Sequence, residues 1–246
     1  MKTTAESSPF RRFLLDSAAT NAREMLVESG FLFDMKLAAA KCGYGLVVSN
    51  TETDTDGYDL VLDDRLSVVP VQLKSTATKT NSWKIHRRLL RPKLDQIHLF
   101  GLSSSSHHAG LAGCVVVVLL EPLLKGQPVQ YLFTDYLLLE ACRAGVHSLG
   151  TRQRKPVERA RMNLLEKPKG QVVLPRAAFV KSPSSESLLA LVGLSSQAAN
   201  GWRNSMRMYL QLRSKPAPLA PAEADEREFY RQLASDELKA ILQRTT

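Results

Sequence analysis

Residues 56–75, DGYDLVLDDRLSVVPVQLKS, constrain the fold of this 246-residue chain more than any other segment. Apolar and polar residues alternate over 58–62 and again over 68–75, which predicts two short β-strands. The polar run Asp63-Asp64-Arg65 separates them and is typical of a turn. The segment therefore predicts a β-hairpin.

Three polar residues of this hairpin are expected to meet at one place. A loop centred on Asp64-Arg65 sets position 59 opposite position 70, and Gln72 and Lys74 follow on the same face because side chains alternate along a strand. The intervening leucines and valines then face a core. A carboxylate, an amide oxygen and an ammonium gathered at strand ends suit a hard divalent cation and the phosphate beside it.

These residues carry a family resemblance. Asp59 with Gln72-Leu73-Lys74 resembles the PD-(D/E)XK nuclease superfamily, and Gly57-Tyr58-Asp59 followed by Val71-Gln72-Leu73-Lys74-Ser75 is similar to its Gln-x-Lys branch. The resemblance covers residues 23–136. It implies an α/β protein of restriction-endonuclease-like fold, a mixed central sheet flanked by helices, with a helical C-terminal extension in this chain.

The resemblance also implies a Mg²⁺ site, which Mn²⁺ can occupy as a substitute. Asp59 would be the main ligand, with the Gln72 amide oxygen and the Leu73 carbonyl as neutral ligands. Lys74 would orient the attacking water or stabilise the pentavalent phosphorus. The family pattern has an acidic residue where this chain has Gln72, which leaves fewer charged ligands, and both active and inactive members carry glutamine there.

The family pattern adds a glutamate on a preceding helix. Glu28, within a helical pattern over residues 21–42, is the best match and would bind the metal directly or through water. Glu24 lies one turn away on nearly the same face and is a rival.

The charge balance favours a polyanionic partner. The net charge is +9 and the isoelectric point is about 9.6. Positive charge concentrates in residues 74–93 and 143–169, so nucleic acid, most naturally double-stranded DNA, is expected to bind there. The expected contacts are Lys79, Trp83, Lys84, Arg87, Arg88, Arg91, Arg152, Arg154 and Arg203. Trp83 either stacks on a base or caps the core, and the basic side chains of 74–93 are expected to be exposed.

Periodicity predicts the remaining elements. Helices are expected over 9–14, 21–42 and 92–100, and strands over 44–49, 114–121 and 129–135. In the long helix the residues expected to face inward are Met25, Leu26, Phe33, Leu37 and Ala40.

The C-terminal part is divided by composition. Residues 143–181 are basic and turn-rich, which indicates an irregular linker or a phosphate-contacting arm. Residues 187–210 have the pattern of a helix-turn-helix that would expose Gln197, Asn200, Arg203 and Asn204, or they form two ordinary packed helices. A Pro/Ala linker (216–225) and a terminal amphipathic helix (226–244), suited to docking or dimerisation, follow.

This reading gives three parts: a nuclease core (1–142), a basic linker or arm (143–181) and a helical C-terminal region (182–246). The longest apolar run, residues 111–120, is too short to span a bilayer, so no membrane association is expected. Cys42, Cys114 and Cys142 show no metal-binding or disulfide pattern and predict reduced core thiols in a cytoplasmic protein.

The sequence thus predicts a Mg²⁺-dependent DNA endonuclease, in restriction, repair or anti-phage defence, that can act as a homodimer. The alternative is a nucleic-acid-binding protein on the same fold that does not cut.

Overall fold

The computed structural model describes residues 8–16, 18–50, 57–102, 106–167, 169–194, 200–215 and 220–244. Its α-helices are α1 (Pro9–Leu15), α2 (Thr20–Lys41), α3 (Arg87–Leu90), α4 (Tyr136–Arg143), α5 (Thr151–Glu166), α6 (Ser185–Val192), α7 (Asn200–Arg213) and α8 (Pro221–Gln243). Its strands are β1 (Val47–Asn50), β2 (Leu60–Asp63), β3 (Val68–Thr76), β4 (Ser82–His86), β5 (Cys114–Leu119), β6 (Gln130–Asp135), β7 (Gln171–Pro175) and β8 (Val180–Ser182). Short 3-10 helices are η1 (Leu94–Phe100), η2 (Ser106–His108), η3 (Leu123–Lys125) and η4 (Arg176–Ala178).

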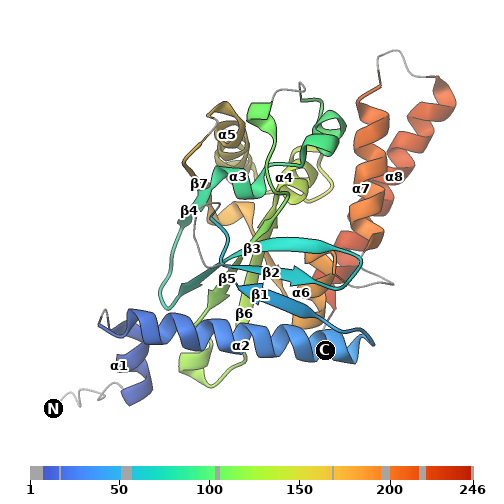
Figure 1. Ribbon diagram of the computed structural model, residues 1–246. Helices are drawn as coiled ribbons and strands as arrows, with labels where there is room; N and C mark the ends of the chain where they lie inside the picture. Colours follow the sequence, from blue (N-terminus) through green and yellow to red (C-terminus); the bar gives the residue numbers. More distant parts are fainter. Residues whose placement is uncertain are drawn as a thin grey trace.

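The strands form a mixed, mainly antiparallel central sheet in the order β1-β2-β3-β5-β6-β8, and a separate ribbon of β4 and β7. Only the β3–β5 neighbours among these described strands run parallel. A parallel neighbour requires a crossover, which residues 77–113 provide and which carries β4, α3 and η1 (Figure 1). The prediction of a mixed sheet flanked by helices is confirmed at this level.

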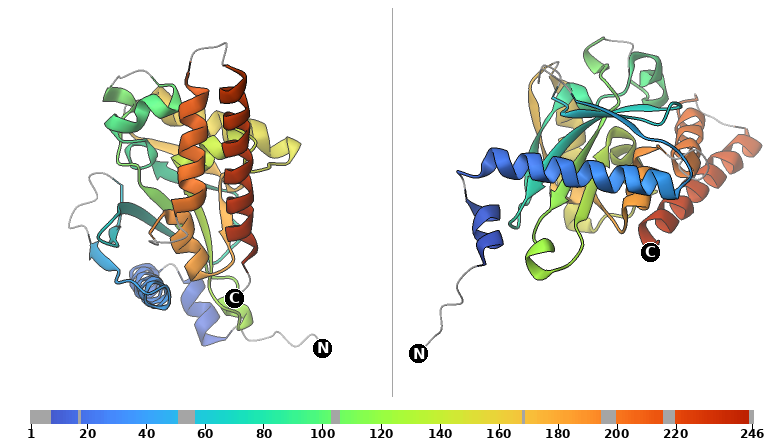
Figure 2. Two further views of the ribbon diagram at one scale, coloured as in Figure 1. Left: turned by 90° about the vertical axis from the view of Figure 1, so that its right-hand side faces the viewer. Right: turned by 60° about the horizontal axis from the view of Figure 1, so that its bottom comes forward.

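Strand β5 is buried on both faces and divides the interior into two cores. Its six residues, CVVVVL, are all buried. Val116 and Val118 point into a core with α2, α6, α7 and α8, whereas Val115 and Val117 point into a core with β4, α3, α5 and β7. Figure 2 shows α2 crossing the molecule apart from the α7–α8 pair. Burial on both faces explains why this strand reads as a continuous apolar run.

The predicted hairpin exists, but its register differs by two residues. Leu60 lies opposite Val71, which places position 59 opposite position 72 rather than 70. The loop is four residues long because Asp64 closes it: its Oδ1 accepts the N–H groups of Leu66 and Ser67 at 2.9 and 2.7 Å. A shift of two keeps every side chain on its predicted face.

Helix α2 forms where predicted, but the prediction of its inward face was wrong. The buried residues are Val27, Phe31, Met35, Ala38 and Ala39, at helical spacing. The residues expected inside are exposed, Met25 by 71% and Phe33 by 66%. Leu26, Leu37 and Ala40 are exposed as well. Because apolar residues occur around most of this helix, periodicity could not select the side that meets the sheet.

Residues 143–181 are not irregular, contrary to the sequence prediction. They form α5, whose inward side carries Val157, Ala160 and Leu164, and the strands β7 and β8. Strand β7 pairs with β4, a strand that the sequence analysis did not predict, and β8 pairs with β6 in the central sheet. The basic side chains of α5 had hidden this core-facing stripe. The predicted 92–100 helix is the 3-10 helix η1.

Helices α6 and α7 are ordinary packed helices, the second of the alternatives above: α6 packs against α2, and α7 packs against α8. Gly193 ends α6 with φ of +91°, and a Cβ there would lie 2.8 Å from Arg203 Cδ. Trp202 is fully buried, and α7 packs along α8 (Figure 2). Gln197 lies outside the described residues. Helix α8 begins at Pro221, five residues inside the predicted linker, because proline is favoured in the first turn of a helix.

No helix in the described ranges is both long enough and apolar enough to cross a membrane.

A buried carboxylate joins α4 to α5. Glu140 has no exposed side-chain surface and forms ion pairs with Arg143 Nη2 at 2.6 Å and Arg161 Nη1 at 3.0 Å. Arg161 also pairs with the half-exposed Glu158 at 2.7 Å. Glu140 therefore ties residues beyond 143 to the central sheet through a desolvated charge network.

Glu140→Ala should lower the free energy of unfolding by about 3–5 kcal/mol, because it leaves Arg161 partly buried without its inner partner. Glu158→Ala is the matched control: it removes the outer carboxylate of the same arginine and should cost under about 1 kcal/mol. Urea denaturation followed by circular dichroism measures both. Equal losses in the two variants would contradict the assignment of Glu140 as the tie.

The cysteines differ in exposure. Cys114 is buried and Cys142 half-buried, as core thiols should be, but Cys42 is exposed after the end of α2. The prediction that all three are core thiols was therefore wrong for Cys42. Burial raises the pKa of the Cys114 thiol, and it raises the pKa of Cys142 to about 12.

One thiol should react rapidly with Ellman's reagent at pH 8 in the native protein, and all three should react in denaturant. The reacting species is the thiolate, which burial suppresses at Cys114 and Cys142. Cys42→Ser should remove the fast phase. A fast phase that survives in Cys42→Ser would show that one of the buried thiols opens to solvent.

Candidate functional site

Asp59 lies immediately before β2 and its carboxylate reaches β3. Asp59 Oδ2 accepts the Leu73 N–H at 2.6 Å, and the Asp59 N–H donates to Val71 O at 2.9 Å. The Asp59 carboxylate thus accepts from β3 the N–H that a main-chain carbonyl of a neighbouring strand would otherwise accept. It is thereby fixed against the main chain between Gln72 and Lys74, so the structure brings these predicted residues together.

Gln72 is buried with an unsatisfied oxygen. The residue is 6% exposed, and its Oε1 has no hydrogen-bond partner within the part of the chain that the structure describes. Leaving such an acceptor unpaired costs about 1–3 kcal/mol. The Leu73 carbonyl points to the same side of β3 as its N–H, toward Asp59, because both groups of a strand residue face one neighbour. These oxygen donors are those a Mg²⁺ or Mn²⁺ ion prefers, so the residues present fit such an ion.

Lys74 follows on the same face of β3. It is half-buried, and its ammonium makes no hydrogen bond or ion pair with any described residue. The register of β3 with β5 sets Gln72 beside Val115 and Lys74 beside Val117, which places both on the side of the second core. An ammonium without a partner among the described residues is available to a substrate anion.

Glu28 approaches the strand ends from α2. It is half-buried, and its Oε1 accepts a hydrogen bond from Asn50 Nδ2 at 2.9 Å. Asn50 lies opposite Leu60, whose side chain faces α2, so Glu28 is on the face of the sheet away from Gln72. Glu24 is exposed. Among the described residues no three or more His, Cys, Asp or Glu side chains form a metal-binding group. Glu28 as a ligand stays a prediction.

His86 is a site residue that the sequence analysis missed. A Cβ added to Gly57 would lie only 2.1 Å from the Cβ of His86, so His86 packs directly against Gly57, two residues before Asp59. The φ of +76° at Gly57 also favours glycine. His86 Nδ1 is buried and has no partner in the described part of the chain. His86 ends β4, which lies in the crossover from β3 to β5 and pairs with β7, and the alternation of Trp83 and Ile85 was the local signal for that strand.

Arg87 follows His86 and is also buried, with 8% exposure. Its Nε and Nη1 find no hydrogen-bond partner among the described residues. A buried guanidinium with unsatisfied nitrogens is unfavourable, so an anion is expected to satisfy it. Helix α3, which Arg87 begins, packs against β3 and β5.

The predicted nucleic-acid contacts fall into two groups. Exposed are Lys79, Lys84, Arg88, Arg152 and Arg154. The expectation of exposure was wrong for Arg87, Arg91 and Arg203. Arg91 is 1% exposed and donates to the carbonyls of Leu164, His107 and Lys167, so it joins three segments of the chain.

The side chains of Arg203 and Trp83 both pack inside the protein. Arg203 pairs with Asp135 at 2.5 Å, and its side chain is 12% exposed. Trp83 packs edge-to-face on Phe179 with ring centroids 4.8 Å apart, so it caps the core. Their burial reflects long-range partners that the basic composition of these segments does not reveal.

Comparisons with known proteins identified no relative of this chain. No protein-family model matches the sequence, and no curated protein or solved structure matches it significantly.

Proposed function

We propose that this chain is a metal-dependent endonuclease that hydrolyses DNA phosphodiester bonds on a restriction-endonuclease-like fold. The observation that carries the proposal is the Asp59 carboxylate, fixed to the Leu73 N–H beside the buried Gln72 Oε1, which has no hydrogen-bond partner in the described ranges. A hard cation would satisfy both groups at once. The order of a helix, three antiparallel strands, a crossover and a parallel strand supports the same assignment.

The residues divide the chemistry between them. Asp59, Gln72 and the Leu73 carbonyl would hold Mg²⁺. Glu28, which is hydrogen-bonded to Asn50 on the other face of the sheet, would have to leave Asn50 to contribute through water. The bound ion supplies Lewis-acid activation of a phosphate and a water. Lys74 would stabilise the negative charge that develops on the phosphoryl oxygens, or orient the water. Arg87 is suited to a phosphate of the same strand.

Supercoiled plasmid should be nicked with Mg²⁺ or Mn²⁺, and Asp59→Asn and Lys74→Ala should each lower the rate by about 10²-fold or more, since each removes a group aimed at the reacting phosphate. Gln72→Glu should lower the Mg²⁺ concentration at half-maximal rate, because it adds a charged ligand.

Asp95→Asn and Lys36→Ala are matched controls, because both residues are exposed and lie outside the site. Each control should nick at the wild-type rate. Nicking that persists unchanged in Asp59→Asn and Lys74→Ala would point to a contaminating nuclease and would reject the site.

A second candidate function is nucleic-acid binding without cleavage. It is favoured by the scarcity of charged ligands: Gln72 replaces an acid, and Glu28 is hydrogen-bonded to Asn50 rather than to the Asp59 site. Binding without nicking by the wild type, at every Mg²⁺ and Mn²⁺ concentration tested, would select this alternative.

Binding should depend steeply on salt through the exposed basic residues of the crossover. The triple variant Lys79→Gln, Lys84→Gln, Arg88→Gln should weaken DNA binding, and it should reduce the slope of log K against log salt by roughly 0.9 for each phosphate that the protein no longer neutralises. Fluorescence anisotropy with a labelled duplex, in buffers of increasing salt, measures the slope.

The control for this measurement removes the same charge elsewhere, through Lys36→Gln, Lys181→Gln and Arg227→Gln. It should leave the slope near the wild-type value. Identical slopes in the two triple variants would mean that only the net charge matters and that the crossover is not the binding surface.

A further inference from the structure

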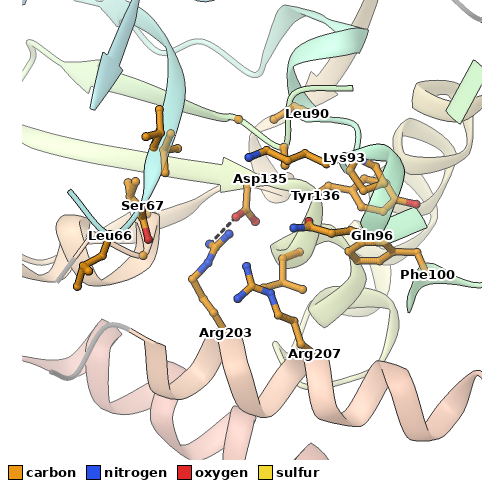
Figure 3. Close-up of a pocket in the computed structure, with 18 residues that line it drawn as sticks. Leu66, Ser67, Leu90, Lys93, Gln96, Phe100, Asp135, Tyr136, Arg203 and Arg207 are labelled. Atoms are coloured by element: carbon orange, nitrogen blue, oxygen red, sulfur yellow. Dashed lines mark hydrogen bonds and ion pairs between the residues drawn. The ribbon is translucent and has the colours of Figure 1, made fainter. Parts of the chain in front are cut away.

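A second polar pocket lies at the other end of the β2–β3 hairpin. Its volume is about 260 Å³. Four elements supply its polar lining: the hairpin loop, the crossover after α3, the end of β6, and α7. The residues that the argument uses are Ser67, Lys93, Gln96, Asp135, Arg203 and Arg207 (Figure 3). Val69 at its rim is three residues from Gln72, about 10 Å along the strand, and neither Asp59 nor Gln72 lines the pocket, so it is separate from the candidate metal site.

The one carboxylate of the pocket is already used. Asp135 Oδ2 accepts from Arg203 Nη1 at 2.5 Å, and Asp135 Oδ1 accepts the Leu138 N–H at 2.7 Å, where it caps α4. Arg203 Nη1 also donates to Leu191 O at 2.8 Å. These contacts hold the Arg203 guanidinium rigidly at the pocket wall.

Two further cations face the same space without a carboxylate. Arg207 makes one weak hydrogen bond, from Nη1 to Asn204 Oδ1 at 3.4 Å, and Lys93 makes no side-chain hydrogen bond or ion pair within the described residues. Figure 3 shows the polar ends of Lys93, Gln96, Arg203 and Arg207 turned toward Asp135. Burial, and secondly repulsion by Arg203, lower the pKa of the Arg207 guanidinium.

The pocket therefore has three cationic groups and one carboxylate, a surplus of two positive charges. Like charges gathered in a half-buried pocket repel one another unless an anion joins them. Arg207 can present a planar guanidinium fork to an oxyanion, and the Gln96 amide adds a neutral donor. Arg203, one helical turn away on α7 and held by Asp135 and Leu191, adds its positive charge at the pocket wall.

We propose that this pocket binds a phosphate monoester. A monoester carries about 1.5–2 negative charges near pH 7 and three terminal oxygens, which matches the surplus charge and the donors present. A phosphodiester carries one charge and must continue in two directions. Leu90, Leu137 and Val192 line the apolar part, which suits a small organic group attached to the phosphate. The inference does not depend on the nuclease proposal.

Isothermal titration with phenyl phosphate and methyl phenyl phosphate, at equal ionic strength and with EDTA present, tests the charge match at a constant aromatic group and without any contribution from a metal site. Phenyl phosphate should bind, and the diester should bind at least about tenfold more weakly, the difference expected for one lost charge-assisted hydrogen bond. Equal affinity for the two, or no binding of phenyl phosphate, would overturn the proposal.

The variants locate the binding. Arg207→Gln and Lys93→Gln should each weaken phenyl phosphate binding about tenfold or more, while Arg207→Lys should retain part of it. Arg227→Gln on α8, which does not line this pocket, is the matched control and should bind as the wild type does. Unchanged binding in both Arg207→Gln and Lys93→Gln would overturn the assignment, and an unchanged melting temperature shows that the variants are folded.

Two further ligands test whether the bound phosphate belongs to a small molecule or to the end of a nucleic acid. A nucleoside 5′-monophosphate represents a small molecule, and a 5′-phosphorylated oligonucleotide, compared with its 5′-hydroxyl counterpart, represents a nucleic-acid end. Arg207→Gln should weaken whichever of the two is bound. If the 5′-hydroxyl oligonucleotide binds as tightly as the phosphorylated one, the pocket does not recognise a nucleic-acid end.

Discussion

Residues 71–76 of β3 run parallel to residues 114–119 of β5, and a chain can reach a parallel neighbour only by crossing a face of the sheet. Here the crossover brings β4 and α3 over the side opposite α2, where β7 and α5 complete a second core. The same crossover sets His86 against Gly57. This one pairing thus determines both the two-core interior and the surroundings of Asp59.

The position of β3 between two neighbours explains why the candidate site holds unsatisfied polar groups. Gln72 is covered on both sides of its strand, so its Oε1 is cut off from water, and Arg87 at the start of α3 is likewise buried. The Gln72 Oε1 and the Arg87 Nε and Nη1 have no hydrogen-bond partner among the residues that the structure describes. A fold selected for stability alone would favour apolar residues at such places. Retaining an acceptor and a cation near a fixed carboxylate is understandable if a metal ion and a phosphate complete them.

Positive charge has two separate uses in this molecule. Arg91, Arg161 and Arg203 are interior groups that join segments through carbonyls or carboxylates. Lys79, Lys84 and Arg88 are exposed on the crossover, and Arg207 with Lys93 faces the pocket at the hairpin loop. The net charge of +9 counts structural and ligand-facing cations alike, so it favours an anionic partner without showing where that partner binds. Ion pairing, rather than composition, distinguishes structural arginines from those available to a ligand.

The sequence by itself determined the features that depend on neighbours along the chain. Period-two alternation predicted the hairpin and the shared face of Asp59, Gln72 and Lys74, and helical spacing predicted α2. Features set by distant partners required the tertiary structure. The hydrogen bonds of Asp64 fixed the register, contact with the sheet chose the buried side of α2, and the β4–β7 pairing placed His86. Local patterns record which faces a segment has, whereas burial and long-range hydrogen bonding decide which face is covered and by what.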